Sequence, residues 1–322
     1  MKLLIVTGSI TLPEISDEEL AEIYEASGEA DIIHAKSAEE ALQYWPDAEV
    51  ALGTLDRATF LTAKKLEWLH SVAAGADMLM FDEMVESEVH LTGEKGLVGE
   101  HLGDHAFALL LTLTRNLMRP IREVPHIWHL RPILRKTMIE LSGSTLGIVG
   151  FGGTGRAVAR RARAFAMDVL AVDLEDVEGT PECPEVWKMD RFHEMLSMSD
   201  VVVICCPITK QTEGLFDDAA FDAMKDTAYL INVTRGPIVD LGSAERALTT
   251  GKIAGAGLDV TPVEPLPEDN VLYTLPNVVV TPHTAGASQF RAHRNVSRFI
   301  ANLRHWRKGE PLEGVIDKQK GF

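Results

Sequence analysis

The sequence is poor in cysteine, with three in 322 residues. Two of them, Cys205 and Cys206, are neighbours in the chain, which is a poor geometry for a disulfide between them. A disulfide framework is therefore excluded, and a reducing compartment is expected. The features of a secretory signal, a longer apolar region and a small-residue cleavage site, are missing from the opening segment MKLLIVTG. No apolar run approaches the length of a membrane span, so we expect a cytoplasmic protein.

Basic residues are scarce beside acidic ones, with 31 Lys and Arg against 48 Asp and Glu and a formal net charge of −17. An acidic surface repels phosphate backbones and anionic lipid headgroups, so binding to nucleic acid or to a membrane is disfavoured. The hydrophobic share of 46% and the charged share of 25% are ordinary for a folded protein and argue against disorder. The length predicts two domains.

What the sequence does contain is an alternation of short apolar runs with longer amphipathic ones. In the first part of the chain we expect helices at 17–26 and 38–44 and strands at 3–6, 30–34, 49–52 and 66–72. A long helix is expected at 99–119. After it we expect helices at 154–165, 192–200, 243–251 and 288–308 and strands at 145–150, 169–173, 201–206, 228–233, 254–260 and 278–283. This rhythm predicts an α/β protein built from parallel sheets that are covered by helices.

A glycine-rich loop after the strand at 145–150 is the strongest single motif. It reads GFGGTG, with Gly150, Gly152 and Gly155 in the G-x-G-x-x-G spacing of dinucleotide-binding loops. The first glycine permits a tight turn, the second lets the backbone approach a pyrophosphate, and the third lets helix and strand pack closely. Backbone N–H groups at the start of the following helix then face the phosphates. The loop predicts a nucleotide cofactor; a ligand-free structural turn and a methyltransferase loop are the weaker interpretations.

The next expected strand ends at Asp173, 18 residues after Gly155, near the offset of a ribose-binding carboxylate. A carboxylate accepts a hydrogen bond from the ribose 2′-hydroxyl, whereas a 2′-phosphate requires Arg or Lys. The residues that follow are Leu174, Glu175 and Asp176, so no basic residue stands at this strand end. The expected cofactor is therefore NAD rather than NADP.

Polar side chains follow three later strands, at the strand ends where ligands bind in open parallel sheets. The segments read LINVTRGPIVD, AGAGLDVTPVEPLP and NVVVTPHTAG, and their polar residues are Arg235, Asp259, Glu264 and His283. Histidine exchanges protons near neutral pH, and a neighbouring carboxylate holds its ring in one tautomer. Arginine offers a planar fork for a substrate carboxylate. An acid, its orienting carboxylate and an anion anchor together suit the reduction of a 2-keto acid by NADH.

These motifs resemble those of the D-isomer-specific 2-hydroxyacid dehydrogenase family. The resemblance runs from about Leu66 onward and also includes the segments SVAAGAD, GDHAFALLLTLTR and CCPITKQTEGLF. The segment before Leu66 matches only in its strand-helix rhythm. The resemblance implies two doubly wound parallel-sheet domains: a Rossmann cofactor domain at 102–284, and a flavodoxin-like substrate domain formed by 1–101 and 285–322.

The resemblance also implies a role for each matching residue. Arg235 would bind the carboxylate and carbonyl of the substrate, His283 would be the general acid/base and also contact the substrate, and Glu264 would be its partner. The substrate carboxylate would further meet the backbone N–H groups of Ala74, Gly75 and Ala76, small residues that let donors approach an anion. The cofactor would be held by Gly150, Gly152, Gly153, Thr154, Gly155, Asp173, Cys206, Pro207, Thr234 and Asp259, the last of these on the nicotinamide carboxamide side.

The function implied is hydride transfer between NAD(H) and a small 2-keto or 2-hydroxy acid such as glyoxylate, hydroxypyruvate or pyruvate, in a homodimer formed through the cofactor domain. An NAD(H)-sensing regulator of the same fold, or a dehydrogenase acting on a non-keto-acid anion, is the alternative. The presence of Arg235, Glu264 and His283 together favours an enzyme over a regulator. His101 and His105 are four residues apart, but no third ligand cluster follows, so we interpret them as core or interdomain residues rather than metal ligands. Trp128 is interpreted as packing a loop, with contact to a partner subunit as the alternative.

Overall fold

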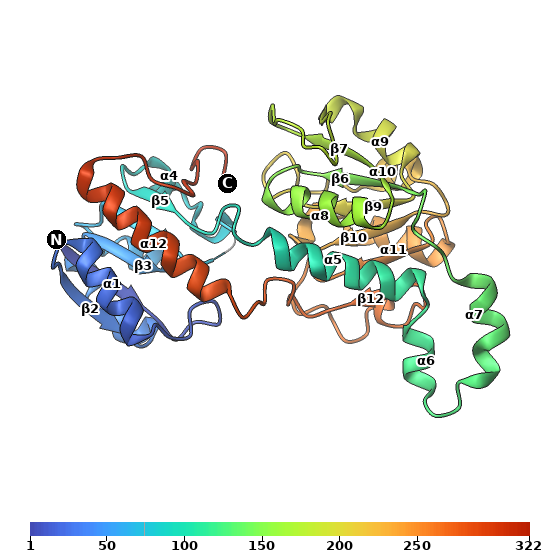
Figure 1. The fold of residues 1–322 in the computed structure, drawn as a ribbon, viewed down its shortest axis with the longest axis horizontal. Helices are drawn as coiled ribbons and strands as arrows, with labels where there is room; N and C mark the ends of the chain where they lie inside the picture. The colour runs from blue at the N-terminus through green and yellow to red at the C-terminus, as the bar shows by residue number, and fades with distance from the viewer. Residues whose placement is uncertain (74) are drawn as a thin grey trace. The chain divides into compact units, whose positions relative to one another are not determined.

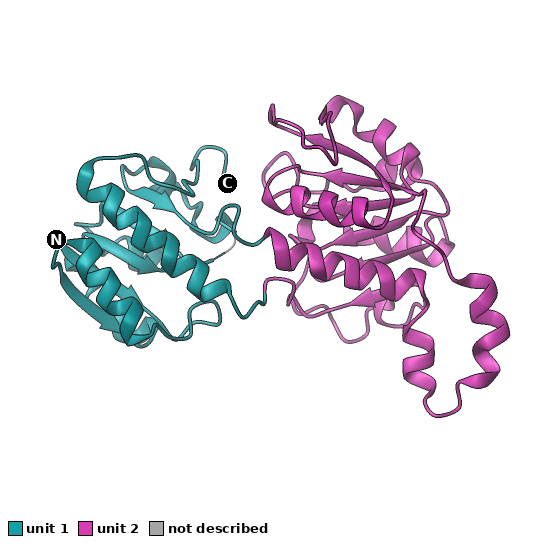
Figure 2. Ribbon diagram, viewed as in Figure 1, with its two compact units in different colours: residues 1–98, 287–322 teal, residues 99–286 magenta. Residues whose placement is uncertain are grey.

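The structure is a computed structural model that describes residues 1–73 and 75–322. Ala74, one of the residues expected to bind substrate, lies outside the described residues. The chain forms two compact units, which Figure 2 distinguishes by colour. Unit 1 comprises Met1–Val98 and Ala287–Phe322, and unit 2 comprises Gly99–Gly286. Each unit contains a parallel β-sheet, so the α/β architecture expected from the alternating pattern is confirmed.

Unit 1 contains a five-stranded sheet in the order β2-β1-β3-β4-β5 (Figure 1). Its strands are β1 (Lys2–Val6), β2 (Asp31–Ala35), β3 (Val50–Gly53), β4 (Trp68–Ser71) and β5 (His90–Thr92). Its helices are α1 (Asp17–Ser27), α2 (Ala38–Ala41), α3 (Arg57–Phe60), α4 (Asp82–Glu86) and α12 (Arg291–Lys308).

The C-terminal helix α12 lies beside α1 on one face of the unit 1 sheet (Figure 1). The ring centroid of its Phe299 lies 5.2 Å from that of Trp68, in β4. Phe299 and Leu303 are fully buried against Leu3 and Ile5 of β1. Unit 1 is therefore completed by a helix that comes from the far end of the chain.

Unit 2 contains a seven-stranded sheet in the order β12-β11-β10-β9-β6-β7-β8. Its strands are β6 (Thr145–Val149), β7 (Asp168–Asp173), β8 (Trp187–Lys188), β9 (Val201–Ile204), β10 (Tyr229–Asn232), β11 (Gly255–Leu258) and β12 (Val278–Val280). Its helices are α5 (Gly99–Thr114), α6 (Met118–Glu123), α7 (Arg131–Thr137), α8 (Gly153–Ala164), α9 (Phe192–Met198), α10 (Asp218–Ala223) and α11 (Leu241–Thr250). Central strands such as β9, with the sequence VVVI, are buried along their whole length, as expected for a sheet covered on both faces.

The prediction of one continuous helix at 99–119 is wrong, because the structure has two helices there, with a break between Thr114 and Met118. α5 ends at Thr114, and Asn116 adopts a left-handed φ of 52°, a conformation that Asn tolerates better than most residues. The N–H of Leu117 then donates to the carbonyl of Thr112 at 2.9 Å, which closes the helix end. The chain continues through α6 and α7, which project from the sheet (Figure 1). In the described part of the chain, no helix combines the length and apolar character that crossing a membrane requires.

All pairings in the unit 2 sheet are parallel, so the carboxyl ends of its strands lie along one edge. The strand order reverses between β6 and β9, because the chain adds strands outward on either side of that pair. Ligands of such sheets bind in the crevice at this reversal. The loops that follow β6, β7, β9, β10, β11 and β12 carry the site residues expected from the sequence in this unit.

Candidate active site

The glycine-rich loop lies at the reversal point of the sheet. Gly150 has a φ of 93°, and a Cβ there would lie 2.6 Å from the backbone nitrogen of Cys206, just after β9. A Cβ on Gly155 would lie 2.2 Å from the carbonyl oxygen of Gly150. A Cβ on Gly152, by contrast, would have no described atom within 4 Å. The packing of the chain itself thus requires the first and third glycines, and the second leaves open space beside the backbone.

Helix α8 begins directly after this open position. Its N-cap is Gly152, which has no side chain to satisfy the first N–H groups of the helix. The first hydrogen bond within the helix runs from the N–H of Arg156 to the carbonyl of Gly152, at 3.0 Å. The N–H groups of Gly153, Thr154 and Gly155 come before this bond, in the first turn of the helix. Such a helix start favours an anion through both its donors and its dipole. The loop and helix therefore fit a pyrophosphate.

Asp173, at the end of β7, lies beside the glycine loop. Its Oδ2 accepts a hydrogen bond from the N–H of Phe151 at 2.6 Å, and its Oδ1 accepts one from the N–H of Glu175 at 2.9 Å. The nearby Arg156 guanidinium lies over the Phe151 ring, 5.2 Å from its centroid, and donates to the carbonyl of Glu178. Each carboxylate oxygen keeps a lone pair for a ligand hydroxyl.

Strands β9 and β10 place three further residues that were expected near a cofactor. Cys206 follows β9 and is buried; burial raises the pKa of its thiol to about 12 although a backbone hydrogen bond opposes that rise, so the thiol stays protonated. Pro207 is exposed, and its carbonyl accepts a hydrogen bond from the Thr212 hydroxyl at 2.7 Å. Thr234 follows β10, and its N–H donates to Asn232 Oδ1 at 3.1 Å.

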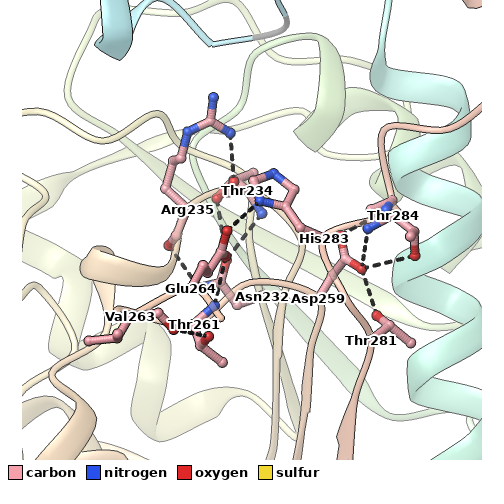
Figure 3. A network of polar contacts seen from close by, with 11 residues as sticks. Asn232, Thr234, Arg235, Asp259, Thr261, Val263, Glu264, Thr281, His283 and Thr284 are labelled. Carbon is pink, nitrogen blue, oxygen red and sulfur yellow. Dashed lines mark hydrogen bonds and ion pairs between the residues drawn. The ribbon is translucent and has the colours of Figure 1, made fainter. Parts of the chain in front are cut away.

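His283 and Glu264 are in hydrogen-bond contact in the loops that follow two neighbouring strands, β12 and β11. The Nδ1 atom of His283 lies 2.8 Å from Oε2 of Glu264, and Figure 3 shows the imidazole turned toward this carboxylate. The other carboxylate oxygen, Oε1, accepts a hydrogen bond from the N–H of Thr261 at 3.1 Å. The two side chains are 47% and 39% exposed, so a substrate has access to the imidazole.

Arg235 lies in the loop after β10, next to the loop that carries Glu264. A Cβ on the following Gly236 would lie 1.9 Å from the carbonyl oxygen of Thr261, so the two loops touch through their backbones and only glycine fits there. Asn232 Nδ2 donates to the carbonyl of Arg235 at 2.9 Å, and Arg235 Nη1 donates to the carbonyl of Thr234 at 2.8 Å (Figure 3). The structure therefore brings together the three loops that carry the expected catalytic side chains.

Asp259 is different from the other polar residues, because its carboxylate is completely buried. Its Oδ1 accepts hydrogen bonds from the Thr281 hydroxyl at 2.6 Å and the Thr284 N–H at 2.9 Å, and its Oδ2 accepts one from the Ala285 N–H at 2.7 Å. Burial raises the pKa of this carboxyl, but hydrogen bonds from His105, Thr281 and the two backbone groups outweigh burial and bring the pKa to about 2. Asp259 is therefore a fixed anion at the end of β11.

Two partners of this anion were not among the residues expected from the sequence to form the site. His105, on α5, places Nε2 at 3.2 Å from Asp259 Oδ1 and at 2.9 Å from the Thr281 hydroxyl oxygen. His105 and Thr281 are separated by 176 positions in the chain, and no local pattern links them. Only the packing of α5 across β11 and β12 could have revealed this contact.

The remaining expected substrate residues lie in unit 1, after the carboxyl end of β4. Gly75 is half-buried and Ala76 is buried. Ala76 directly precedes a short 3₁₀ turn at Asp77–Leu79. Small residues thus stand where the sequence predicted backbone donors.

Comparison with known proteins now adds to this geometry. Residues 107–285 match the family described as D-isomer specific 2-hydroxyacid dehydrogenase, NAD binding domain. A glyoxylate reductase from Korarchaeum cryptofilum is 35% identical over 286 residues, which cover 85% of this chain and 83% of that protein. A glyoxylate reductase from Pyrococcus furiosus is 33% identical over 275 residues, which cover 82% and 80%. The crystal structure of a D-isomer specific 2-hydroxyacid dehydrogenase family protein from Aeromonas salmonicida covers 98% of this chain and 99% of its own, at a TM-score of 0.79 and 28% identity.

The parallel sheets and the match to an NAD binding domain define an oxidoreductase that uses a nicotinamide cofactor. The chain belongs to the D-isomer specific 2-hydroxyacid dehydrogenase family. Its reaction is the interconversion of a 2-keto acid and a 2-hydroxy acid.

Proposed function

We propose that this enzyme reduces a small 2-keto acid such as glyoxylate, hydroxypyruvate or pyruvate with NADH, and that His283, Glu264 and Arg235 carry the reaction. The observation that carries the proposal is the 2.8 Å contact between His283 Nδ1 and Glu264 Oε2. The relatives named glyoxylate reductase support a small 2-keto acid as the substrate.

The chemistry at the imidazole follows from its hydrogen bond. We assign the hydrogen on Nδ1 of His283 as the donor in its hydrogen bond to Glu264, so Nε2 is the atom that exchanges a proton with the substrate. A nicotinamide cofactor held by the glycine loop would supply the hydride that the keto carbon receives in the reduction. Nε2–H of His283 protonates the keto oxygen. In the reverse direction, the same nitrogen takes the hydroxyl proton. Arg235 donates hydrogen bonds to the substrate carboxylate and polarises the neighbouring carbonyl.

For the cofactor, we propose that the start of α8 binds the pyrophosphate and that Asp173 accepts from the ribose hydroxyls. The open space at Gly152 and the N–H groups of the first turn of α8 support the first role. Preference for NAD over NADP is supported by the Asp173 carboxylate at the end of β7, which lies beside the glycine loop. A 2′-phosphate placed against Asp173 would meet the negative charge of its carboxylate. The lining residues are Gly150, Gly153, Thr154, Gly155, Cys206, Pro207, Thr234 and Asp259.

We further propose that unit 2 is the cofactor domain and unit 1 the substrate domain, with backbone N–H groups of Gly75 and Ala76 binding the substrate carboxylate.

A homodimer formed through unit 2 is supported by the segment of α6 and α7 that projects from its sheet, on which Ile121, Val124 and Trp128 are 66%, 67% and 78% exposed. Sedimentation at micromolar concentration tests the assembly, and a monomeric enzyme with full activity would contradict it. A cytoplasmic location is supported by the three cysteines, all of which are free.

The experiment that tests the reaction is NADH oxidation by the purified enzyme across a panel of 2-keto acids, repeated with NADPH. His283→Ala should lower kcat by about 10²- to 10⁴-fold, the usual contribution of a general acid, with NADH affinity changed less than about twofold. His293→Ala is the matched control, because that histidine is exposed and pairs with Glu19 in unit 1. Unchanged turnover in the His283 variant would contradict the assignment. Tight NADH binding without turnover on any acid would indicate a sensor, and reduction of NAD by phosphite would indicate a dehydrogenase for another anion.

A further inference from the structure

His105 projects from the second turn of α5 and contacts two side chains at the strand ends. Its Nε2 lies 3.2 Å from Asp259 Oδ1 and 2.9 Å from Thr281 Oγ1. The His105 side chain is 22% exposed, whereas the Asp259 carboxylate has no exposed surface. A polar side chain from a helix thus meets a buried anion to which no role in proton transfer has been given above.

The positions of the protons follow from the short distances. Asp259 is ionised, so its oxygens only accept hydrogen bonds. The Thr281 hydroxyl, 2.6 Å from Asp259 Oδ1, must therefore be the donor in that bond. The Thr281 oxygen is then an acceptor toward His105, and Nε2 of His105 carries the hydrogen that both oxygens share. His105 is consequently one of the hydrogen-bond donors that surround the Asp259 carboxylate.

Asp259, in turn, holds the segment that carries the acid/base histidine. Its carboxylate accepts from the N–H groups of Thr284 and Ala285, at 2.9 Å and 2.7 Å. Its main-chain carbonyl accepts from the N–H of His283 at 2.8 Å. His283 has a φ of 53°, a left-handed conformation that non-glycine residues adopt only when their surroundings impose it. The contacts of Asp259 with residues 283–285 provide that constraint (Figure 3).

We propose that His105 is a positioning residue for His283. By donating to Asp259 and Thr281, its Nε2–H keeps the Asp259 carboxylate turned toward the N–H groups of residues 284 and 285, and so fixes the left-handed turn on which the His283 imidazole stands. The inference rests on the proposed role of His283 as acid/base. It adds α5, the helix with which unit 2 begins, to the structures that set the geometry of the reaction.

The test compares two replacements of His105 in the complete enzyme. Gln places an amide N–H near the position of Nε2, whereas Leu fills similar volume without a donor. We expect His105→Leu to lower kcat for the keto-acid substrate about 10- to 100-fold, the size expected for loss of a hydrogen bond to a charged group. His105→Gln should keep kcat within about threefold of that of the original enzyme, because the amide N–H of Gln can donate to the charged carboxylate of Asp259 in place of Nε2–H. Asp104→Asn is the control on the same helix, because Asp104 pairs with Arg161 and does not contact Asp259.

A double-mutant cycle separates positioning from general support of the fold. If His105 acts through Asp259, then His105→Leu should lower kcat little further once Asp259→Asn is present. Full multiplication of the two effects would overturn the proposal, as would wild-type kcat in His105→Leu or an equal loss in the Gln and Leu variants. Should Leu prevent folding, judged by circular dichroism, His105→Asn replaces it, because its shorter amide stops short of Asp259.

The outcomes distinguish this proposal from the function on which it rests. An unsubstituted enzyme that turns over no keto acid contradicts the proposed function. An enzyme that is active, inactivated by His283→Ala and unaffected by His105→Leu contradicts only the role of His105.

Discussion

Replacement of Glu264 by Gln is the substitution that isolates the carboxylate charge from the shape of the site. Glu264 uses both oxygens, accepting from His283 Nδ1 at 2.8 Å and from the Thr261 N–H at 3.1 Å. Gln has one carbonyl oxygen, so in either orientation of the amide one of these two donors faces an NH₂ group. A hydrogen bond to a charged group contributes about 1.5–3 kcal/mol. Because the His283 and Glu264 side chains are 47% and 39% exposed, solvent screening favours the lower end of that range.

The expected result is therefore a fall in kcat of about tenfold, since about 1.4 kcal/mol corresponds to one factor of ten. Steady-state NADH oxidation measures kcat, and titration of NADH by its fluorescence measures cofactor affinity, which should stay within about twofold because the glycine loop is unchanged. Glu268→Gln is the matched control, an exposed residue of the same Pro-rich turn. An unchanged kcat in the Glu264 variant, with the control also unchanged, would refute the view that the carboxylate orients the imidazole.

Three other predictions follow from the same geometry. Gly152→Ala should leave the thermal unfolding temperature unchanged and weaken NADH binding at least about tenfold, because its Cβ would enter only the open space proposed for the pyrophosphate. Gly155→Ala should destabilise the fold instead, because its Cβ would lie 2.2 Å from a carbonyl oxygen. Equal NADH affinity in the Gly152 variant would argue against a pyrophosphate at this position. Asp173→Asn should raise the ratio of kcat/KM for NADPH to that for NADH about tenfold or more, and an unchanged ratio would remove Asp173 from cofactor selection. In Asp259, burial raises the pKa but hydrogen bonds bring it to about 2, below the ordinary 3.8, so its stabilisation is complete above about pH 4 and is lost as the pH falls toward 2. Between about pH 4 and pH 2, the free energy of unfolding in urea should therefore fall by about 2 kcal/mol less in Asp259→Asn than in the original protein. Parallel plots of this free energy against pH for the two proteins would contradict the prediction.

Apolar runs of four or more residues marked most of the strands that the sequence predicted. Continuous apolar runs such as LGIV in β6 and VVVI in β9 are buried, as is typical of a parallel strand that is covered on both faces. The short edge strands β5 and β8, with three and two residues, carry no such signature and were not expected. Their pairing depends on neighbouring strands rather than on their own composition.

The site shows the same division between local and distant information. The glycine loop and the polar residues at strand ends are local patterns, and the topology of the sheet then gathers them along one edge. The contact of His105 with Asp259 depends instead on how α5 crosses β11 and β12. The end of α5 likewise depends on the left-handed conformation of Asn116, which the spacing of apolar residues in 99–119 does not predict.

The way α12 closes unit 1 has a consequence for biosynthesis. The strands of unit 1 are made before unit 2, whereas Phe299 and Leu303, which cover one face of their sheet, are made after it. Unit 2 lies between them in the chain, so its own core can form while that face of unit 1 is still bare. Exposed apolar strands of this kind are prone to aggregate before they are covered. The core of unit 1 can therefore close only after unit 2 has been made, and a chain truncated before α12 would keep the sheet of unit 2 while exposing the apolar face of the unit 1 sheet.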